Sequence, residues 1–428
     1  MMTRRRATGV IAGAAACAFG CSSGRSKQSV VRFWAVGREG EVAAELVQGF
    51  EAAHPEIGVE VQTLPWTAAH EKLLTAFAGD ALPDLCQLGN TWVPEFAALK
   101  ALEPLDGYAA LSRGAPFSDY FEGFLNANRI DGAVYGVPWY VDTRLLYYRR
   151  DVLRSAGFDA PPTSWDEWTR MLAAVKQFVG PDRYSVLLPL NEFEPLLVLA
   201  LQQPAPLLRD DGRWGNFRSE DFRRALRFYH SMFERGWAPL TTNTAISNVW
   251  DEFGKGLFTF YISGPWNIAE FKRRMPADLR DAWMTAPMPG PDGPGVSTAG
   301  GASLVIFRSS QRKAEAWALA EHLSQPHVQQ RFYELTGDMP PRRTSWELPA
   351  LTQSEYARAY RVQLDRVRSP PKVPEWERIA NEMKLMGERV VHGAAGIDEA
   401  VADLDRRTDQ ILEKRRWMLD RKRIADGG

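Results

Sequence analysis

The chain has few of the residues that disulfide, metal and phosphate chemistry require. Of its 428 residues only 3 are cysteine and 6 are histidine. The histidines are scattered over the chain, at positions 54, 70, 230, 322, 327 and 392. Beyond the amino-terminal leader there is no Gly-x-Ser-x-Gly elbow, and no phosphate-cradling Gly-x-x-x-x-Gly-Lys motif occurs. We therefore expect no metal and no cofactor, and no disulfide framework.

Neither sign of charge dominates the sequence. The 52 Lys and Arg residues are balanced by 53 Asp and Glu residues, which leaves a formal net charge of −1. A nucleic-acid-binding protein would carry an excess of basic residues, so nucleic acid is not an expected partner. After residue 19 no apolar stretch is long enough to span a bilayer. Any attachment to a membrane is therefore expected at the amino terminus.

The first residues are typical of an export signal. Three arginines at positions 4–6 precede an apolar run over 7–19 that is too short for a membrane span. The run ends at Cys21 in a motif that resembles the lipobox of bacterial lipoproteins. We expect residues 1–21 to be a signal peptide with lipidation at Cys21, and simple cleavage to a soluble protein is the alternative. The arginines leave twin-arginine export open, and Cys86 would then be a buried thiol.

The residues after the leader alternate between strand and helix patterns. Short β-rich runs at 30–34, 59–62 and 84–88 are separated by segments whose apolar residues recur with helical spacing, as at 42–53. Such alternation predicts a mainly parallel sheet covered by helices. At 428 residues the chain exceeds the size of a single core, so two domains are expected.

A second α/β region follows residue 135. Residues 145–148 form an apolar strand pattern, and Ser164 with Glu167 has the spacing of a capping box at the start of a helix. Further buried strands are expected at 257–262 and at 303–307. The tail over 376–415 has a helical pattern.

Several short motifs occur in an order that is more specific than any one of them. They are Phe33-Trp34, 38–41, 79–85, 135–140, 147–151, 263–266, 300–302 and 336–340. Together they resemble the family 1 extracellular solute-binding proteins, the maltose, trehalose and oligosaccharide receptors of ABC importers. The resemblance implies two α/β lobes joined by crossing strands that act as a hinge, with a ligand cleft between the lobes. The expected lobes are 30–141 plus 296–324 for lobe 1, and 144–292 plus 327–428 for lobe 2.

Three positions follow from the resemblance as parts of a sugar site. Asp142 lies where relatives place a carboxylate that accepts hydroxyl hydrogens, although it could be an ordinary salt-bridged acid. Arg144 lies on the same side of an extended segment, so it either binds the ligand or neutralises Asp142. Trp266 follows Gly264 and Pro265 at a strand end, where the family places a tryptophan that stacks on a sugar ring.

Other aromatic and glycine residues are candidates for the same site. The chain has 15 Trp, 12 Tyr and 21 Phe residues, and sugar rings offer flat apolar faces to such side chains. We consider Trp66, Trp92 and Tyr140 as ligand contacts, with a role in the core as the alternative. Gly300 and Gly301 would let backbone amides approach a ligand, or would form a turn that requires positive φ.

Polar side chains after two successive strands complete the expected lobe 1 wall. Arg38 and Glu39 follow the opening strand, and Asn90 and Thr91 follow the strand at 84–88. Open α/β folds receive ligands at the carboxyl ends of their strands. We therefore expect these four residues at the ligand.

Two further groups are candidates for ligand binding outside this wall. Asn191 and Glu192 are the expected contribution of lobe 2, with a solvated loop as the alternative. Arg342 matches an arginine that relatives direct into the cleft, although Arg343 could fill that place.

These features together predict an extracytoplasmic sugar receptor of an ABC importer, and not an enzyme. The expected partners are a small carbohydrate and the permease subunits in the inner membrane, and the receptor is expected to be a periplasmic monomer. A disaccharide or short oligosaccharide is expected, first an α-glucoside such as trehalose or maltose. A glycoside hydrolase, which needs two opposed carboxyl groups, and a sugar sensor not coupled to transport are the alternatives.

Overall fold

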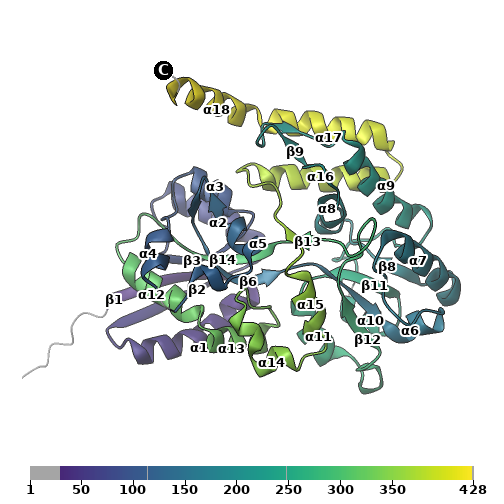
Figure 1. Cartoon of the computed structure of the whole chain (residues 1–428), viewed down its shortest axis with the longest axis horizontal. Helices are drawn as coiled ribbons and strands as arrows, with labels where there is room; N and C mark the ends of the chain where they lie inside the picture. Colours follow the sequence, from purple (N-terminus) through teal and green to yellow (C-terminus); the bar gives the residue numbers. More distant parts are fainter. Residues whose placement is uncertain (1–28, 113, 247, 427–428) are drawn as a thin grey trace, which may run out of the picture.

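The computed structural model describes residues 29–112, 114–246 and 248–426, with the side chains of 422–426 excepted. The expected signal peptide and Cys21 lie outside the described residues. The chain folds into two α/β lobes, which Figure 1 shows side by side. Each lobe has its own sheet, with helices on both faces.

Lobe 1 is built on a five-stranded sheet of order β2-β1-β3-β14-β6. The strands are β1 (Ser29–Val36), β2 (Ile57–Leu64), β3 (Leu85–Gly89), β6 (Val137–Asp142) and β14 (Gly300–Ile306). Its helices are α1 (Gly37–Ala53), α2 (Trp66–Ala78), α3 (Val93–Ala98), α4 (Asp106–Leu111), α5 (Glu122–Ala127), α12 (Lys313–Leu323) and α13 (Pro326–Thr336). Smaller elements are η1 (Phe117–Asp119), β4 (Arg129–Ile130) and β5 (Ala133–Val134). Apolar side chains of α1, α12 and α13 cover one face of the sheet, and those of α2 and α3 cover the other.

Lobe 2 is built on a four-stranded sheet of order β12-β7-β11-β8. The strands are β7 (Leu145–Arg149), β8 (Tyr184–Leu187), β11 (Phe258–Ser263) and β12 (Trp283–Ala286). Its helices are α6 (Arg150–Ser155), α7 (Trp165–Val179), α8 (Glu194–Leu201), α9 (Glu220–Glu234), α10 (Val249–Gly254), α11 (Trp266–Arg274), α16 (Trp376–Val391), α17 (Ile397–Ile411) and α18 (Glu413–Asp426). Smaller elements are η2 (Ala277–Leu279), β9 (Leu208–Arg209) and β10 (Trp214–Gly215). Because side chains alternate along β7, Leu146 and Tyr148 join the core under α7, α8 and α9, whereas Leu145 and Tyr147 face α10 and α11.

The chain passes between the lobes three times. It leaves lobe 1 from β6 to β7, returns from β12 to β14 through β13 (Ser297–Thr298), and enters lobe 2 again through β15 (Val367–Arg368). The third passage includes η3 (Thr344–Glu347), α14 (Pro349–Thr352) and α15 (Ala357–Gln363). Thr143 Oγ1 donates to the backbone O of Thr298 at 3.1 Å, and Ser297 Oγ donates to that of Arg144 at 2.6 Å. These bonds tie two of the crossing segments together.

Both sheets are mixed, whereas the sequence pattern predicted mainly parallel pairing. β1 pairs parallel with β2 and β3, but β14 runs antiparallel to β3 and β6. In lobe 2, β7 runs antiparallel to β11 and β12. The antiparallel strands β14 and β7 are those that begin directly after a passage between the lobes. Each enters its sheet from the end opposite to that of its neighbours. The apolar periodicity of a strand does not indicate the direction in which it runs.

The boundary expected near residues 324–327 is wrong, because α13 packs in lobe 1. Val328 and Phe332 of α13 lie in the same apolar cluster as the β1 residue Phe33, and the ring of Phe332 stacks on that of Trp139 with centroids 4.6 Å apart. Arg331 pairs with Glu45 of α1 at 2.6 Å. The third passage therefore begins after α13.

Local sequence signals explain several element boundaries. Ser164 Oγ caps α7 by accepting from the backbone N–H of Glu167 at 3.2 Å, as the capping-box spacing predicted. The Glu167 carboxylate accepts from the hydroxyl and the N–H of the preceding Thr163 and from the backbone of Ser164, and these bonds lower its pKa. Cys86 is a buried free thiol, and burial raises its pKa.

A cavity between the lobes as candidate ligand site

A cavity of about 630 Å³ lies between the lobes and is lined by both of them. Lobe 1 contributes residues at the ends of β1, β3 and β6, and lobe 2 contributes residues at the starts of α8, α10, α11 and α16. The crossing segments lie between these walls. The cavity therefore has the position that the family resemblance implied for a ligand cleft.

Most of the residues that the sequence singled out line this cavity. They are Arg38, Glu39, Trp66, Asn90, Thr91, Trp92, Tyr140, Asp142, Arg144, Trp266, Gly300 and Gly301. They come together because the carboxyl ends of β1 and β3 open toward the crossing strand β6. Contact of each with a ligand remains a prediction.

Arg144 lies at the centre of the crossing segments. Its Nη2 is 3.0 Å from Glu194 Oε1 and 3.7 Å from Asp142 Oδ2, and its guanidinium lies 4.9 Å from the ring centroid of Trp266. Although burial disfavours the charge, the carboxylates of Asp142 and Glu194 raise the pKa of Arg144. Arg144 thus neutralises the acidic residues around it and holds one face of Trp266.

Asp142 presents an acceptor that no side chain in the structure uses. Its Oδ1 is buried and has no hydrogen-bond partner among the described residues. Burial raises the pKa of the Asp142 carboxyl, and the nearby Arg144 opposes that rise. A buried acceptor without a partner costs free energy, which a ligand hydroxyl would recover by donating to it.

Trp266 is placed by the glycine that precedes it. A Cβ atom at Gly264 would collide with the ring of Trp266 and with the carboxylate of Asp142. The hydroxyl of Tyr147 donates to the backbone O of Gly264 at 2.6 Å, and so fixes the turn between β11 and α11. Glycine at position 264 is therefore a steric requirement for placing this ring at the cavity.

The lobe 1 wall contains a second pair of acids. Glu39 and Asp338 are both buried, and burial is the main reason that the pKa of each carboxyl is raised. Repulsion by Glu39 and Asp142 raises that of Asp338 further. Beside them, Asn90 Oδ1 accepts from Ser303 Oγ at 2.8 Å, which leaves Asn90 Nδ2 as a buried donor without a partner among the described residues. The wall thus offers both acceptors and a donor.

Tryptophans stand on both sides of the cavity. In lobe 1 the rings of Trp66 and Trp92 meet edge to face, with centroids 5.6 Å apart. In lobe 2, Trp250 is held by a 2.7 Å hydrogen bond from its Nε1 to Asn267 Oδ1, close to Trp266 on the next helix. The cavity is therefore apolar at its sides and polar at its centre.

Eleven further residues line the cavity without having been predicted from the sequence. The residues are Gly89, Phe193, Glu194, Leu197, Trp250, Glu270, Thr298, Thr336, Asp338, Pro370 and Glu377. Asp338 lies within the motif at 336–340 and could have been found there. Glu194, Trp250 and Glu377 lie in the first turns of helices whose place in the fold depends on distant contacts, so no local signal identifies them.

Three expected ligand contacts lie outside the cavity lining. Asn191 and Glu192 hydrogen bond to Asn243 at 2.6 and 2.7 Å. Arg342 is 5% exposed and donates to Asp119 Oδ2 at 2.7 Å. It also donates to the backbone O atoms of Gly114 and Ser324, so its guanidinium holds lobe 1 segments together.

Arg343, the alternative to Arg342, is not in the cavity lining either. It pairs with Asp365 at 3.3 Å, and its guanidinium lies 4.4 Å from the ring centroid of Phe121.

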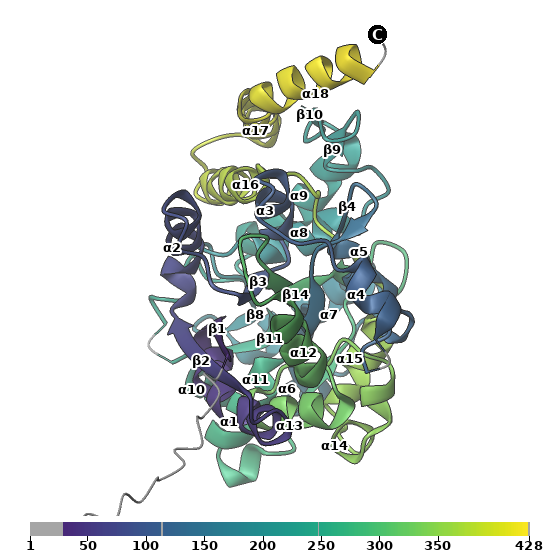
Figure 2. The same ribbon diagram turned by 90° about the vertical axis from the view of Figure 1, so that its left-hand side faces the viewer.

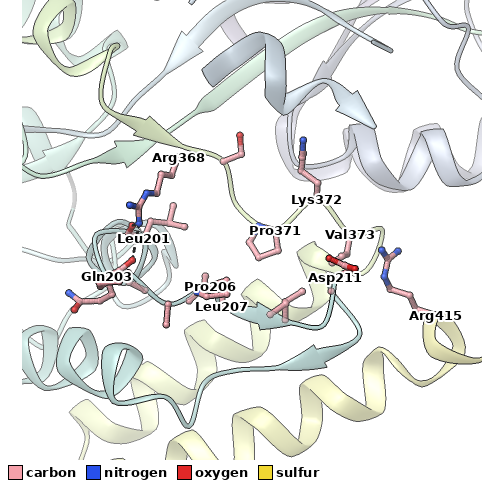
Figure 3. A pocket seen from close by; sticks show the side chains of 16 residues that line it. Leu201, Gln203, Pro206, Leu207, Asp211, Arg368, Pro371, Lys372, Val373 and Arg415 are labelled. Atoms are coloured by element: carbon pink, nitrogen blue, oxygen red, sulfur yellow. Dashed lines mark hydrogen bonds between the residues drawn. The ribbon is translucent and has the colours of Figure 1, made fainter. Parts of the chain in front are cut away.

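A second cavity, of about 450 Å³, lies in lobe 2 outside the cleft (Figure 3). Two of its cations have backbone partners, since Arg368 donates to Leu201 and Gln203, and Lys372 donates to Asn126 and Arg129. The third, Arg415, has a buried Nε without a partner among the described residues. Over the part of the chain that the structure describes, no cluster of His, Cys, Asp or Glu could hold a metal ion. Within the same residues no helix is long and apolar enough to cross a membrane.

Known proteins resemble this chain in both sequence and fold. The model of a family described as bacterial extracellular solute-binding protein matches residues 45–358. The sugar-binding protein MalE from Xanthomonas citri is 56% identical, and its structure aligns with 92% of this chain and 99% of its own with a TM-score of 0.89. The GacH receptor of Streptomyces glaucescens, solved unliganded and with acarbose, is 25% identical over 90% of this chain and 99% of its own, with a TM-score of 0.78.

A curated relative is the diacetylchitobiose binding protein DasA of Streptomyces coelicolor, which is 23% identical over 83% of each chain. The structural matches confirm the expected two-lobed α/β fold. Together with the match over most of the length, they lead to one conclusion: the chain belongs to the bacterial extracellular solute-binding protein family.

Proposed function

We propose that the chain is the extracytoplasmic sugar receptor of an ABC importer, which captures a disaccharide or short oligosaccharide and delivers it to the permease. The observation that carries the proposal is the cavity between the lobes, where Trp266, Arg144 and Asp142 meet. The 56% identical relative is described as a sugar-binding protein. An α-glucoside such as maltose or trehalose is the first candidate ligand.

The chemistry of the cavity supports a carbohydrate ligand. Its volume of about 630 Å³ falls within the range of small-molecule sites. Unpartnered acceptors and donors at its centre, such as Asp142 Oδ1 and Asn90 Nδ2, suit hydroxyl groups, which both donate and accept. Tryptophan rings on the two walls suit the apolar faces of the sugar.

Hinge closure is the proposed mechanism. Each lobe supplies only part of the cavity lining, so a ligand that contacts both walls stabilises the form in which the lobes are close. The crossing segments, tied by Thr143 and Ser297, are the proposed hinge. The permease would recognise the closed form.

A sugar panel tests the proposal directly. Purified protein is heated with maltose, trehalose, maltotriose, diacetylchitobiose or lactose, and the hits are measured by calorimetry. At a hundredfold excess over Kd, a ligand stabilises by about 2.7 kcal/mol, which raises Tm by several degrees. Maltose or trehalose is expected to give the largest rise. If no sugar raises Tm, the proposed function is wrong.

The alternatives predict different results with the same sugars. A hydrolase would release monosaccharide during an overnight incubation, and the relatives named above are binding proteins, so we expect none. A sensor uncoupled from transport would leave sugar uptake unchanged when the gene is deleted, whereas we expect uptake to fall.

We propose an extracytoplasmic location with a lipid anchor on Cys21. Growth with a labelled fatty acid should label the wild-type protein and leave a Cys21→Ser variant unlabelled. Label on both proteins, or on neither, would contradict the anchor.

A further inference from the structure

Helix α18 lies at the outer edge of lobe 2, and among its described side chains Arg416 and Asp420 attach it to that lobe. Figures 1 and 2 show it at the end of the molecule in both views. Arg416 Nη1 donates to the backbone O of Arg213 at 3.0 Å, and its guanidinium lies 3.8 Å from the ring centroid of Trp214. Asp420 forms an ion pair with Arg213. These contacts fix α18 on the β9–β10 hairpin.

The opposite face of α18 carries exposed apolar and basic side chains. Lys414, Trp417, Met418 and Arg421 follow at helical spacing, so they share this face. Trp417 and Met418 are each 55% exposed, and the Arg421 guanidinium lies 4.1 Å from the ring centroid of Trp417. A single exposed hydrophobic side chain is ordinary on a protein surface, but here a tryptophan and a methionine are adjacent and lie between cations.

Helix α18 also lies beside the rim of the cleft. A cavity between the lobes is lined by His70 of α2 and by residues of α16 and α17, so these helices form the rim of the cleft. Helix α18 continues directly from α17. If the chain is a receptor that delivers its ligand to an importer, as proposed above, this rim faces the membrane when the ligand is released.

The charge of this region complements an anionic surface. The chain as a whole has a formal net charge of −1, yet residues 413–421 carry four basic side chains against two acidic ones. At the rim, Arg378, Arg406 and Arg407 lie beside Glu377 and Glu382, and Arg406 and Arg407 pair with Asp403. The cationic excess therefore lies on α18 itself. Anionic headgroups attract such clusters, and tryptophan prefers the boundary between headgroups and acyl chains.

We propose that α18 contacts the surface of the membrane, with Trp417 and Met418 at the headgroup level and Lys414 and Arg421 against lipid phosphates. A membrane surface fits this face better than a protein does, because the two apolar side chains are flanked by cations and form no continuous apolar stripe. The contact holds the rim of lobe 2 toward the importer.

Co-sedimentation with vesicles tests the proposal. The chain is purified from residue 22 onward, so that the expected leader and any acyl chain are absent while every described residue is kept. It is mixed with vesicles of phosphatidylglycerol and phosphatidylcholine in equal parts, or of phosphatidylcholine alone. We expect binding to the anionic vesicles only, and expect it to fall as salt increases.

Variants separate α18 from the rest of the surface. The changes Lys414→Glu with Arg421→Glu, and separately Trp417→Ala, should each weaken vesicle binding, the charge reversal by at least about tenfold. A matched control is Arg154→Glu with Phe178→Ala on α6 and α7, which changes an exposed cation and a ring of equal exposure away from the rim. The control should bind vesicles as the wild type does.

Each other outcome overturns the proposal. Equal binding to neutral vesicles, or binding that the α18 variants leave unchanged, excludes a role for this face. Variants that lose uptake in cells but keep vesicle binding assign α18 to a protein contact. The sugar-induced rise in Tm is measured on the wild type and on every variant. A wild type that shows no rise would count against the proposed function. An α18 variant that keeps the rise but no longer binds vesicles supports the membrane contact alone.

Discussion

Arg144 shows how a single residue can serve both stability and ligand binding. Its guanidinium contacts acidic side chains on β6 and α8 and lies against the ring of Trp266. The sequence left open whether Arg144 binds a ligand or neutralises Asp142. The structure shows the ion pair, and the cavity beside it keeps the ligand contact as a prediction.

Trp266→Ala should weaken sugar binding strongly. The substitution removes a ring whose stacking contributes about 1 kcal/mol beyond the area that it buries, so we expect at least a tenfold rise in Kd by calorimetry. Trp266→Phe should retain part of the affinity. Trp417→Ala, which removes a ring far from the cavity, is the control and should bind sugar normally. Equal affinity in Trp266→Ala and wild type would exclude the stacking role.

Asp142→Asn should separate affinity from stability. The amide keeps the shape but removes a charged acceptor, so sugar affinity should fall by about tenfold or more. Because burial raises the pKa of this carboxyl, its ionised form destabilises the fold at neutral pH. We therefore expect the unliganded variant to melt at the same temperature as the wild type or higher. A lower Tm with unchanged Kd would contradict this assignment.

Single residues could be predicted from the sequence where a motif or a strand end marked them. Glu39 and Asn90 follow strands of lobe 1, so local pattern was sufficient for them, whereas Trp266 was identified through the family resemblance. Arg342 also follows a recognised motif, yet its guanidinium hydrogen bonds to Asp119 and does not line the cavity. Which polar side chain meets a buried partner depends on segments far away in the sequence.

At the scale of elements, helices of both lobes bring ionisable side chains together at the rim of the cleft. His70 of α2 hydrogen bonds to Glu95 of α3 with 2.6 Å between Nε2 and Oε2. That bond is the main reason that the pKa of His70 lies above its ordinary 6.5, and charge on Glu95, Glu377 and Glu71 adds to it. Glu377 belongs to α16, so lobe 2 contributes to the field at this histidine.

His70→Gln should remove a pH-dependent part of the stability. A raised pKa means that the folded state favours the protonated imidazole. The stabilisation is thus complete below pH 6.5 and is lost as pH rises through the raised value. We expect urea unfolding to show a difference between wild type and variant of up to about 1 kcal/mol near pH 6, which shrinks toward pH 9.

The partner variant makes this test specific. Glu95→Gln should lose the same pH dependence, and the double variant should lose no more than either single one. If His70→Gln and Glu95→Gln act additively, the hydrogen bond between them is not the source.

Element types were easier to predict than element placement. The capping box at Ser164 and the strand at 145–148 depend on neighbours in sequence, and both formed as expected. The helix α13 was assigned to the wrong lobe because its partners Trp139 and Glu45 lie far away in the chain. Direction of pairing in the crossing strands was missed for the same reason.

At the scale of the whole molecule, closure should be visible as compaction. The cavity has walls from both lobes, so a ligand that binds both should reduce the radius of gyration measured by small-angle scattering. The Trp266→Ala variant, at the same sugar concentration, should compact less. A tight ligand that leaves the scattering curve unchanged would contradict hinge closure. The scattering intensity at zero angle also tests whether the protein is a monomer, as expected from the sequence.

The place of β14 determines when the molecule can fold during its synthesis. Residue Leu304 pairs with Gln87 of β3 and with Val137 of β6, so the strand between them is made long after both. A nascent chain that ends before Gly300 has the two halves of the lobe 1 sheet without the strand that joins them. Contacts this distant in sequence form slowly. We therefore expect the lobe 1 sheet of the newly made protein to form later than that of a chain with local contacts.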